Sequence, residues 1–173
     1  MSDSSNYPEN FIRTQFVLNV VGLVLGYLYK GGKVFGVENI LDSYFLTKVL
    51  IVDDDLNSTI PIAHVLMSEG CSVDVVDSGY QGAKNLLIEK YDLIIIDWSM
   101  PHFNGGKTIE LMDKLVNNKR LPYVLYTGVN PQSISLPNSS NLQLIDFWQK
   151  AKFTKGGASR AKSVVQRIKK GKA

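Results

Sequence analysis

The chain is poor in the residues that build disulfide scaffolds and soft-metal sites. It has one cysteine, Cys71, and two histidines, His64 and His102, which lie far apart in the sequence. A single cysteine excludes an internal disulfide, and the cysteine and histidine clusters of a zinc site are missing. A reducing cytoplasm is the simplest setting for such a chain.

Strong charge and long apolar runs are also lacking. The net charge of +3 is too small to imply nucleic-acid binding by itself. The apolar stretch at residues 16–29 has fourteen residues, whereas a membrane-spanning helix needs about 20. The first residues lack the basic side chains of a secretory signal. With 173 residues, the chain has room for one ordinary domain and an extension.

From residue 48 onward, short apolar runs alternate with longer stretches of helical periodicity. We expect strands at residues 48–52, 72–76, 93–96, 123–126 and 143–148. We expect helices at about residues 57–69, 80–90, 106–117 and 158–168. This alternation is typical of an α/β domain in which helices cover a parallel sheet.

The sequence also predicts how the first two helices begin and which faces they bury. Asn57 or Ser58 is expected to cap the first helix, with Pro61 in its first turn. Ile60 is counted with the buried stripe of the first helix, and Leu87 with that of the second.

Polar residues stand at the ends of four of the expected strands. Asp53 and Asp54 follow the first strand, Asp97 the third, Thr127 the fourth and Lys150 the fifth. Open parallel sheets bind ligands outside the carboxyl ends of their strands, so these side chains should converge. Carboxylates, a hydroxyl and an ammonium would suit a hard divalent cation and a phosphoryl group.

The order and spacing of these residues resemble the receiver domain of two-component response regulators, over residues 48 to about 170. Pro101 and Gly105 stand four and eight residues after Asp97, Thr127 thirty after it, and Lys150 twenty-three after Thr127. The resemblance implies a doubly wound, flavodoxin-like fold, with a five-stranded parallel sheet in the order 2-1-3-4-5.

The resemblance also implies a role for each acid. Asp97 would be the phosphoacceptor. Asp53, Asp54 and Asp97 would bind Mg²⁺ together with the backbone carbonyl of Ser99. Such a receiver catalyses its own phosphorylation and dephosphorylation and is not an enzyme acting on a separate substrate.

The remaining site residues follow from the same resemblance. Lys150 and Thr127 would contact the phosphoryl group, and Thr127 and Phe147 would form the switch that responds to phosphorylation. Ser99 and Val129 would tune dephosphorylation.

Two features depart from the family pattern. Ala151 follows Lys150 where the family usually has proline. Lys152, two residues after Lys150, is an alternative candidate for the lysine that contacts the phosphoryl group. Residues 128–141, where a fourth helix should lie, hold two prolines, four serines and three asparagines. Such a composition makes a poor helix interior, so we expect a short or irregular fourth helix.

We expect the first 47 residues to form a separate hydrophobic extension. Residues 16–29 and 34–46 read as two helices, with a β-hairpin turning at Gly31 and Gly32 as the alternative. We expect the extension to form a homodimer, and a membrane anchor is the less favoured reading. The residues expected at the interface are Val17, Val20, Val21, Leu23 and Leu25.

The chain therefore reads as a stand-alone response regulator or a phosphorelay receiver. Its partners would be a sensor histidine kinase or a histidine phosphotransfer protein, and a downstream target protein. From residue 150 there are nine lysines and arginines and no acid. Without interleaved aromatics we do not favour nucleic-acid binding, and we expect no DNA-binding effector domain after the receiver. The alternative function is a pseudo-receiver scaffold that never turns over phosphate.

Overall fold

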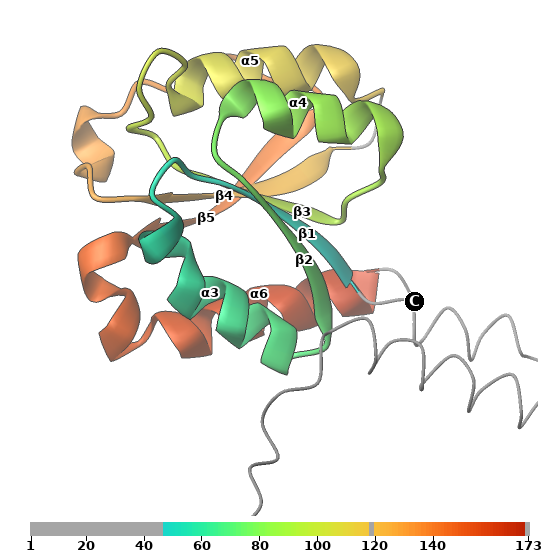
Figure 1. Ribbon diagram of the computed structural model, residues 1–173. Coiled ribbons are helices and arrows are strands. Elements are labelled where there is room, and N and C mark those ends of the chain that lie inside the picture. The colour runs from blue at the N-terminus through green and yellow to red at the C-terminus, as the bar shows by residue number, and fades with distance from the viewer. Residues whose placement is uncertain (1–46, 118–119, 172–173) are drawn as a thin grey trace, which may run out of the picture. The chain divides into compact units, whose positions relative to one another are not determined.

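The computed structural model describes residues 47–117 and 120–171, which form a parallel sheet with two helices on each face (Figure 1). The five strands, in the spatial order β2-β1-β3-β4-β5, are β1 (Thr47–Val52), β2 (Cys71–Val76), β3 (Leu93–Ile96), β4 (Leu121–Thr127) and β5 (Leu142–Gln149). All four pairings between neighbouring strands are parallel. The predicted doubly wound fold and strand order are confirmed.

The helices sort onto the two faces of the sheet. α3 (Leu56–Ser68) and α6 (Gly157–Gly171) lie on one face, and α4 (Gly79–Ile88) and α5 (Gly105–Leu115) lie on the other (Figure 1). No helix among the described residues is long and apolar enough to cross a membrane. The expectations for the extension, including its interface residues Val17, Val20, Val21, Leu23 and Leu25, lie outside the described residues.

The central strands are apolar throughout because both of their faces are covered. Every residue of β3 is fully buried, and alternate residues along β1 belong to two separate core clusters. Val49 and Ile51 pack on the side of α3 and α6, and Leu50 and Val52 pack on the other side. Such unbroken apolar runs are typical of parallel strands buried on both faces.

The start of α3 differs from the prediction. Asp55 caps the helix by accepting a hydrogen bond from the backbone N–H of Asn57 at 3.1 Å, so neither Asn57 nor Ser58 is the cap. The helix therefore begins at Leu56, and Pro61 falls in its second turn instead of its first. The Ser58 side chain is free for another role, described below.

Two predicted core residues are exposed. Ile60 is 63% exposed, because the buried stripe of α3 contains Ile62, and positions two apart point to opposite sides of a helix. Leu87 is 67% exposed in the last turn of α4. The buried residues of α4 are the small Gly79, Gly82 and Ala83 in its first turns. A Cβ at Gly82 would lie 2.9 Å from a Val52 methyl carbon of β1, and one at Gly79 would collide with Thr108 of α5, so the close contacts of α4 lie in these turns and Leu87 lies beyond them.

The predicted irregularity after β4 is confirmed. A single 3-10 turn, η1 (Pro131–Ser133), takes the place of a fourth covering helix. The end of this loop is tied to α5, because the Asp113 carboxylate accepts hydrogen bonds from the backbone N–H groups of Asn141 at 2.7 Å and Leu142 at 2.9 Å, and from the Ser139 hydroxyl.

Candidate phosphoacceptor and cation site

The sheet itself carries the two buried acids to one place. The backbone N–H of Asp53 donates to the Val76 carbonyl at 3.0 Å, and that of Asp97 donates to the Val52 carbonyl at 2.9 Å. Each acid thus extends the hydrogen-bond ladder by one step beyond its strand. Because β1 and β3 are neighbours, the two side chains emerge together at the carboxyl end of the sheet.

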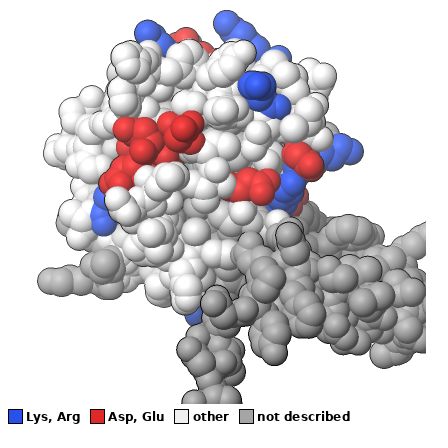
Figure 2. Space-filling view, viewed as in Figure 1, with Lys and Arg blue, Asp and Glu red and all other residues white. Residues whose placement is uncertain are grey.

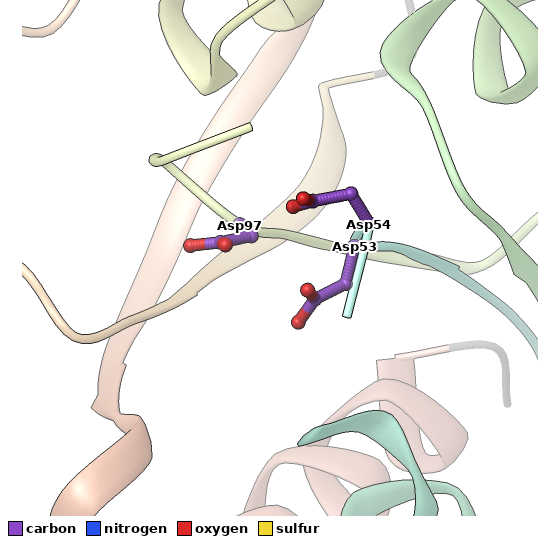
Figure 3. A group of neighbouring side chains, drawn as sticks. All are labelled: Asp53, Asp54 and Asp97. Atoms are coloured by element: carbon purple, nitrogen blue, oxygen red, sulfur yellow. The ribbon is translucent and has the colours of Figure 1, made fainter. Parts of the chain in front are cut away.

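Asp53, Asp54 and Asp97 form a cluster whose carboxylate oxygens lie within 4.8 Å of one another. Figure 3 shows the carboxylates of Asp54 and Asp97 pointing the same way, with that of Asp53 turned toward the side of α3. Asp53 and Asp97 are buried, whereas Asp54 is exposed. Figure 2 shows acidic side chains gathered on this face of the domain, beside the carboxyl end of the sheet.

Lys150 supplies the cation of the cluster. Its ammonium nitrogen lies 2.8 Å from Asp53 Oδ2 and 2.9 Å from Asp97 Oδ2. Burial alone would lower the pKa of Lys150, but its hydrogen bonds to the two acids outweigh this effect and raise the pKa. Lys150 therefore stays charged beside the two acids, and its predicted contact with a phosphoryl group stays a prediction. The side chain of Lys152 lies outside the described atoms.

Asp53 is held on several sides. Besides Lys150, its carboxylate accepts hydrogen bonds from the Ser58 hydroxyl at 2.7 Å and from the backbone N–H of Asp55 at 3.0 Å. Burial raises the pKa of Asp53, although these hydrogen bonds act in the opposite direction. A buried carboxylate with a raised pKa gains from a nearby cation, because the cation favours the charged form.

The loop after Asp97 is fixed by its backbone. The N–H of Ser99 donates to Asp97 Oδ1 at 3.2 Å, and the N–H of Gly105 donates to the Trp98 carbonyl at 3.0 Å. A Cβ at Gly105 would lie 2.6 Å from the Asp97 carbonyl oxygen, so only glycine fits without moving the backbone. The Ser99 side chain is exposed. The predicted metal contact of the Ser99 carbonyl stays a prediction.

Thr127 and Phe147 are not among the charged groups of the cluster. Thr127 is fully buried at the end of β4, and its hydroxyl accepts a hydrogen bond from the backbone N–H of Val129 at 3.3 Å. Alternation along β4 places Thr127 on the same face as Leu125, whose partner on β5 is Phe147. Phe147 is half-buried and also lines a cavity of about 520 Å³ beside η1 and the start of α6.

The sequence reasoning missed two residues at the site. Ser58 was read as a helix cap, but it binds Asp53. Tyr126 was read as a strand residue, but its ring lies 5.6 Å from the Lys150 ammonium, and its hydroxyl donates to the Ser58 carbonyl at 3.0 Å. The sequence signal that could point to these two residues is their closeness to predicted site residues: Tyr126 directly precedes Thr127, and Ser58 follows Asp53 by five residues.

The donor set fits a small divalent cation. Magnesium prefers carboxylate and carbonyl oxygens and is bound through few protein ligands. Three carboxylates against one ammonium leave a formal excess of two negative charges in the cluster. The exposed side of Asp54 leaves room for water or a substrate oxygen as further ligands.

Comparisons with known proteins agree with this geometry. The chain is 33% identical over 83 residues to the response regulator ArlR of Staphylococcus saprophyticus, a match that covers 48% of this chain and 36% of that protein. It is 31% identical over 93 residues to the two-component response regulator ARR3 of Arabidopsis thaliana, covering 47% of this chain and 40% of that protein. The chain thus spans well under half the length of these curated relatives.

Solved structures share the fold. The receiver domain of a sensor histidine kinase from Pseudomonas aeruginosa, which has a magnesium ion in its active-site cleft, has a TM-score of 0.59 at 22% identity and covers 72% of this chain and 98% of that one. A CheY-like receiver domain protein from Methanospirillum hungatei has a TM-score of 0.58 at 23% identity and covers 73% and 98%.

The family model of the response regulator receiver domain matches residues 49–152, which include both buried acids, Thr127 and Lys150. This match spans more than half of the chain. The chain belongs to the response regulator receiver domain family.

Proposed function

We propose that this chain accepts a phosphoryl group on the Asp97 carboxylate from a phosphohistidine donor. The observation that supports this most directly is the convergence of three strand ends, which places the Lys150 ammonium 2.8 Å from Asp53 Oδ2 and 2.9 Å from Asp97 Oδ2. A structural ion pair would need only one acid. Two buried acids on one ammonium, with a third beside them, favour a site that handles further charge.

Each residue then has a defined part in the transfer. One Asp97 oxygen attacks phosphorus in line, forming the acyl phosphate O–P bond as the N–P bond of the donor breaks. Asp53, Asp54, Asp97 and the Ser99 carbonyl would hold Mg²⁺, which supplies charge neutralisation on the phosphoryl oxygens. Lys150 would pair with another of these oxygens.

The switch would use the face shared by Thr127 and Phe147. In the present structure the Thr127 hydroxyl accepts from the Val129 N–H, and it would instead donate to a phosphoryl oxygen. The movement of Thr127 would free space for Phe147, which is only half-buried and borders a cavity. Ser99 and Val129 would set the lifetime of the acyl phosphate, since each lies two residues beyond a site residue.

We further propose that the chain acts as a stand-alone regulator or a phosphorelay receiver in the cytoplasm. Its donor would be a histidine kinase or a phosphotransfer protein, and it would signal by contact with a target protein. The loop at residues 128–141 contains a single 3-10 turn in place of a helix, and the Asp113 carboxylate accepts a hydrogen bond from its last residue, Asn141. The target protein would therefore contact an irregular segment at this surface.

The test is incubation with acetyl phosphate in the presence and absence of Mg²⁺, followed by intact-mass measurement. The full chain should gain one phosphoryl group only with Mg²⁺, and Asp97→Asn should gain none. An unmodified wild-type chain, with an active donor and Mg²⁺ present, would favour the pseudo-receiver scaffold.

A further inference from the structure

Apart from Asp53 and Asp97, few contacts hold the Lys150 ammonium in place. Lys150 is the first residue of the 3-10 helix η2 (Lys150–Lys155), and the preceding Gln149 makes no side-chain capping hydrogen bond. The lysine side chain is a flexible four-carbon stem. Among the described residues, the contacts recorded for its ammonium are Asp53, Asp97 and the face of the Tyr126 ring at 5.6 Å.

The Tyr126 ring is itself firmly held. The residue is 3% exposed, and its hydroxyl donates to the Ser58 carbonyl in the first turn of α3 at 3.0 Å. The Tyr126 and Phe153 rings form a T-shaped pair, with centroids 5.4 Å apart and an angle of 75° between the ring planes. Burial of the ring and its contact with Phe153 hold the ring in this orientation, and the hydroxyl adds one hydrogen bond.

The contact of Lys150 with the Tyr126 ring differs from its contacts with the acids once a divalent cation or a phosphoryl group occupies the site. A divalent cation or a phosphorylated Asp97 would take up the carboxylate oxygens that now bind Lys150. The ring offers a neutral, electron-rich face that no metal ion competes for. Burial raises the pKa of Tyr126, a direction that Asp53 and Asp97 reinforce and Lys150 opposes, so the ring stays neutral.

We propose that Tyr126 is a positioning residue that keeps the Lys150 ammonium beside Asp97 through a cation–π contact while the acids are occupied. The inference rests on the proposed phosphoacceptor function. Tyr126 touches no reacting atom and acts only through Lys150. The same contacts tie the end of β4, the first turn of α3 and the lysine into one unit, because Ser58 binds Asp53 through its hydroxyl and Tyr126 through its carbonyl.

The test uses the full chain with phenylalanine at position 126 carrying zero, one, two or three ring fluorines. Fluorination withdraws electron density from the ring face with little change in shape, so it weakens a cation–π contact but not ordinary packing. The rate of Asp97 phosphorylation by acetyl phosphate is measured at saturating Mg²⁺. We expect Tyr126→Phe to stay within about twofold of wild type, and the trifluorinated ring to be slower by about threefold to tenfold, with a graded series between them.

The matched control is Tyr123, which lies on the same strand, is 2% exposed and packs on the opposite face of the sheet. The same fluorinated rings at position 123 should leave the rate unchanged. A flat series at position 126 would overturn the inference, as would an equal loss at position 123. If Tyr126→Phe lost as much rate as the trifluorinated ring, the hydroxyl would be the important group and the inference would again be overturned.

The failure of the proposed function has a different signature. A wild-type chain that gains no phosphoryl group overturns that function and, with it, this role of Tyr126. A flat fluorine series in a chain whose wild type is phosphorylated overturns the Tyr126 inference alone.

Discussion

Lys150 is the residue on which the charge balance of the site depends. Lys150→Ala would leave Asp53 and Asp97 facing each other without their cation. We expect the phosphorylation rate with acetyl phosphate and Mg²⁺ to fall by about tenfold or more, because a preorganised charge aimed at the phosphoryl oxygens is lost. Lys152→Ala is the matched control and should retain the wild-type rate. Equal losses, or a larger loss at Lys152, would contradict the assignment of Lys150.

Asp53 should make both stability and Mg²⁺ affinity depend on pH. Its pKa is raised by burial, so its folded-state pKa lies above the value of about 3.9 in an unfolded chain. Its contribution to metal-free stability is therefore fully present below about pH 4 and is lost as the pH rises through the folded-state pKa. In the same range Mg²⁺ affinity should increase, because the proton no longer competes for the carboxylate.

Calorimetric titration with Mg²⁺ at several pH values tests this expectation. Asp53→Asn should weaken Mg²⁺ binding by about tenfold or more and flatten the pH dependence of metal-free stability. Asp77→Asn, at an exposed acid just after β2, should change neither. Unchanged Mg²⁺ affinity in Asp53→Asn would remove this residue from the cation site.

The sequence indicated the acids and Lys150 because each stands at a strand end, where chain position alone predicts convergence. Tyr126 and Ser58 could not be found in this way. The role of Tyr126 depends on a contact across 24 residues with Lys150, and that of Ser58 depends on the helix starting at Leu56. Such contacts are set by tertiary packing, which a single sequence does not display.

Among the elements, the loop that replaces a fourth helix depends on Asp113. The carboxylate accepts hydrogen bonds from the backbone N–H groups of Ser140, Asn141 and Leu142 and from the Ser139 hydroxyl, where the loop meets β5. We expect Asp113→Ala to lower the free energy of unfolding by about 1–3 kcal/mol, because these donors, most of them partly buried, lose a charged acceptor. Glu110→Ala, at an exposed position on the same helix, should change it by less than about 0.5 kcal/mol.

The pKa of Asp113 predicts how its contribution to stability depends on pH. Burial alone would raise the pKa of Asp113, but its hydrogen bonds from Ser139, Asn141 and Leu142 outweigh this effect and lower it. The stabilisation is therefore present above about pH 4 and is lost as the pH falls through the folded-state pKa. Urea denaturation of wild type and Asp113→Ala should show a difference that shrinks in acid. A constant difference down to pH 3 would mean that the carboxylate charge is not involved.

Element type and order were predictable, and element details were less so. The apolar runs of β1 and β3 and the proline- and serine-rich stretch after β4 each had a local cause, so the sheet and the missing helix followed from the sequence. The capping residue of α3 did not follow from the sequence, because Asp55, Asn57 and Ser58 are all good capping residues. In the folded chain the Ser58 hydroxyl binds Asp53, and Asp55 caps the helix. The prediction that Leu87 is buried was wrong because the small residues of α4 lie in its first turns, so this helix packs on the domain there and Leu87 lies in its last turn.

For the whole molecule, the hydrophobic extension at residues 1–47 predicts self-association. A helix that is apolar on most of its surface needs cover, and both faces of the receiver sheet already carry helices. We expect the full chain to be at least dimeric in sedimentation equilibrium without detergent, and a shortened chain starting at Leu46 to be monomeric. A full-length monomer would contradict the dimer, and solubility only in detergent would favour a membrane anchor.

The central claim is that Asp97 carries a phosphoryl group as an acyl phosphate. The most direct measurement is borohydride reduction of the chain after treatment with acetyl phosphate and Mg²⁺, followed by peptide mass spectrometry. Reduction converts an aspartyl phosphate to homoserine and leaves free aspartate unchanged. The account predicts homoserine at position 97, only when Mg²⁺ and the donor are both present. Aspartate at position 97 after reduction, or homoserine at another acid such as Asp53 or Asp54, would contradict it.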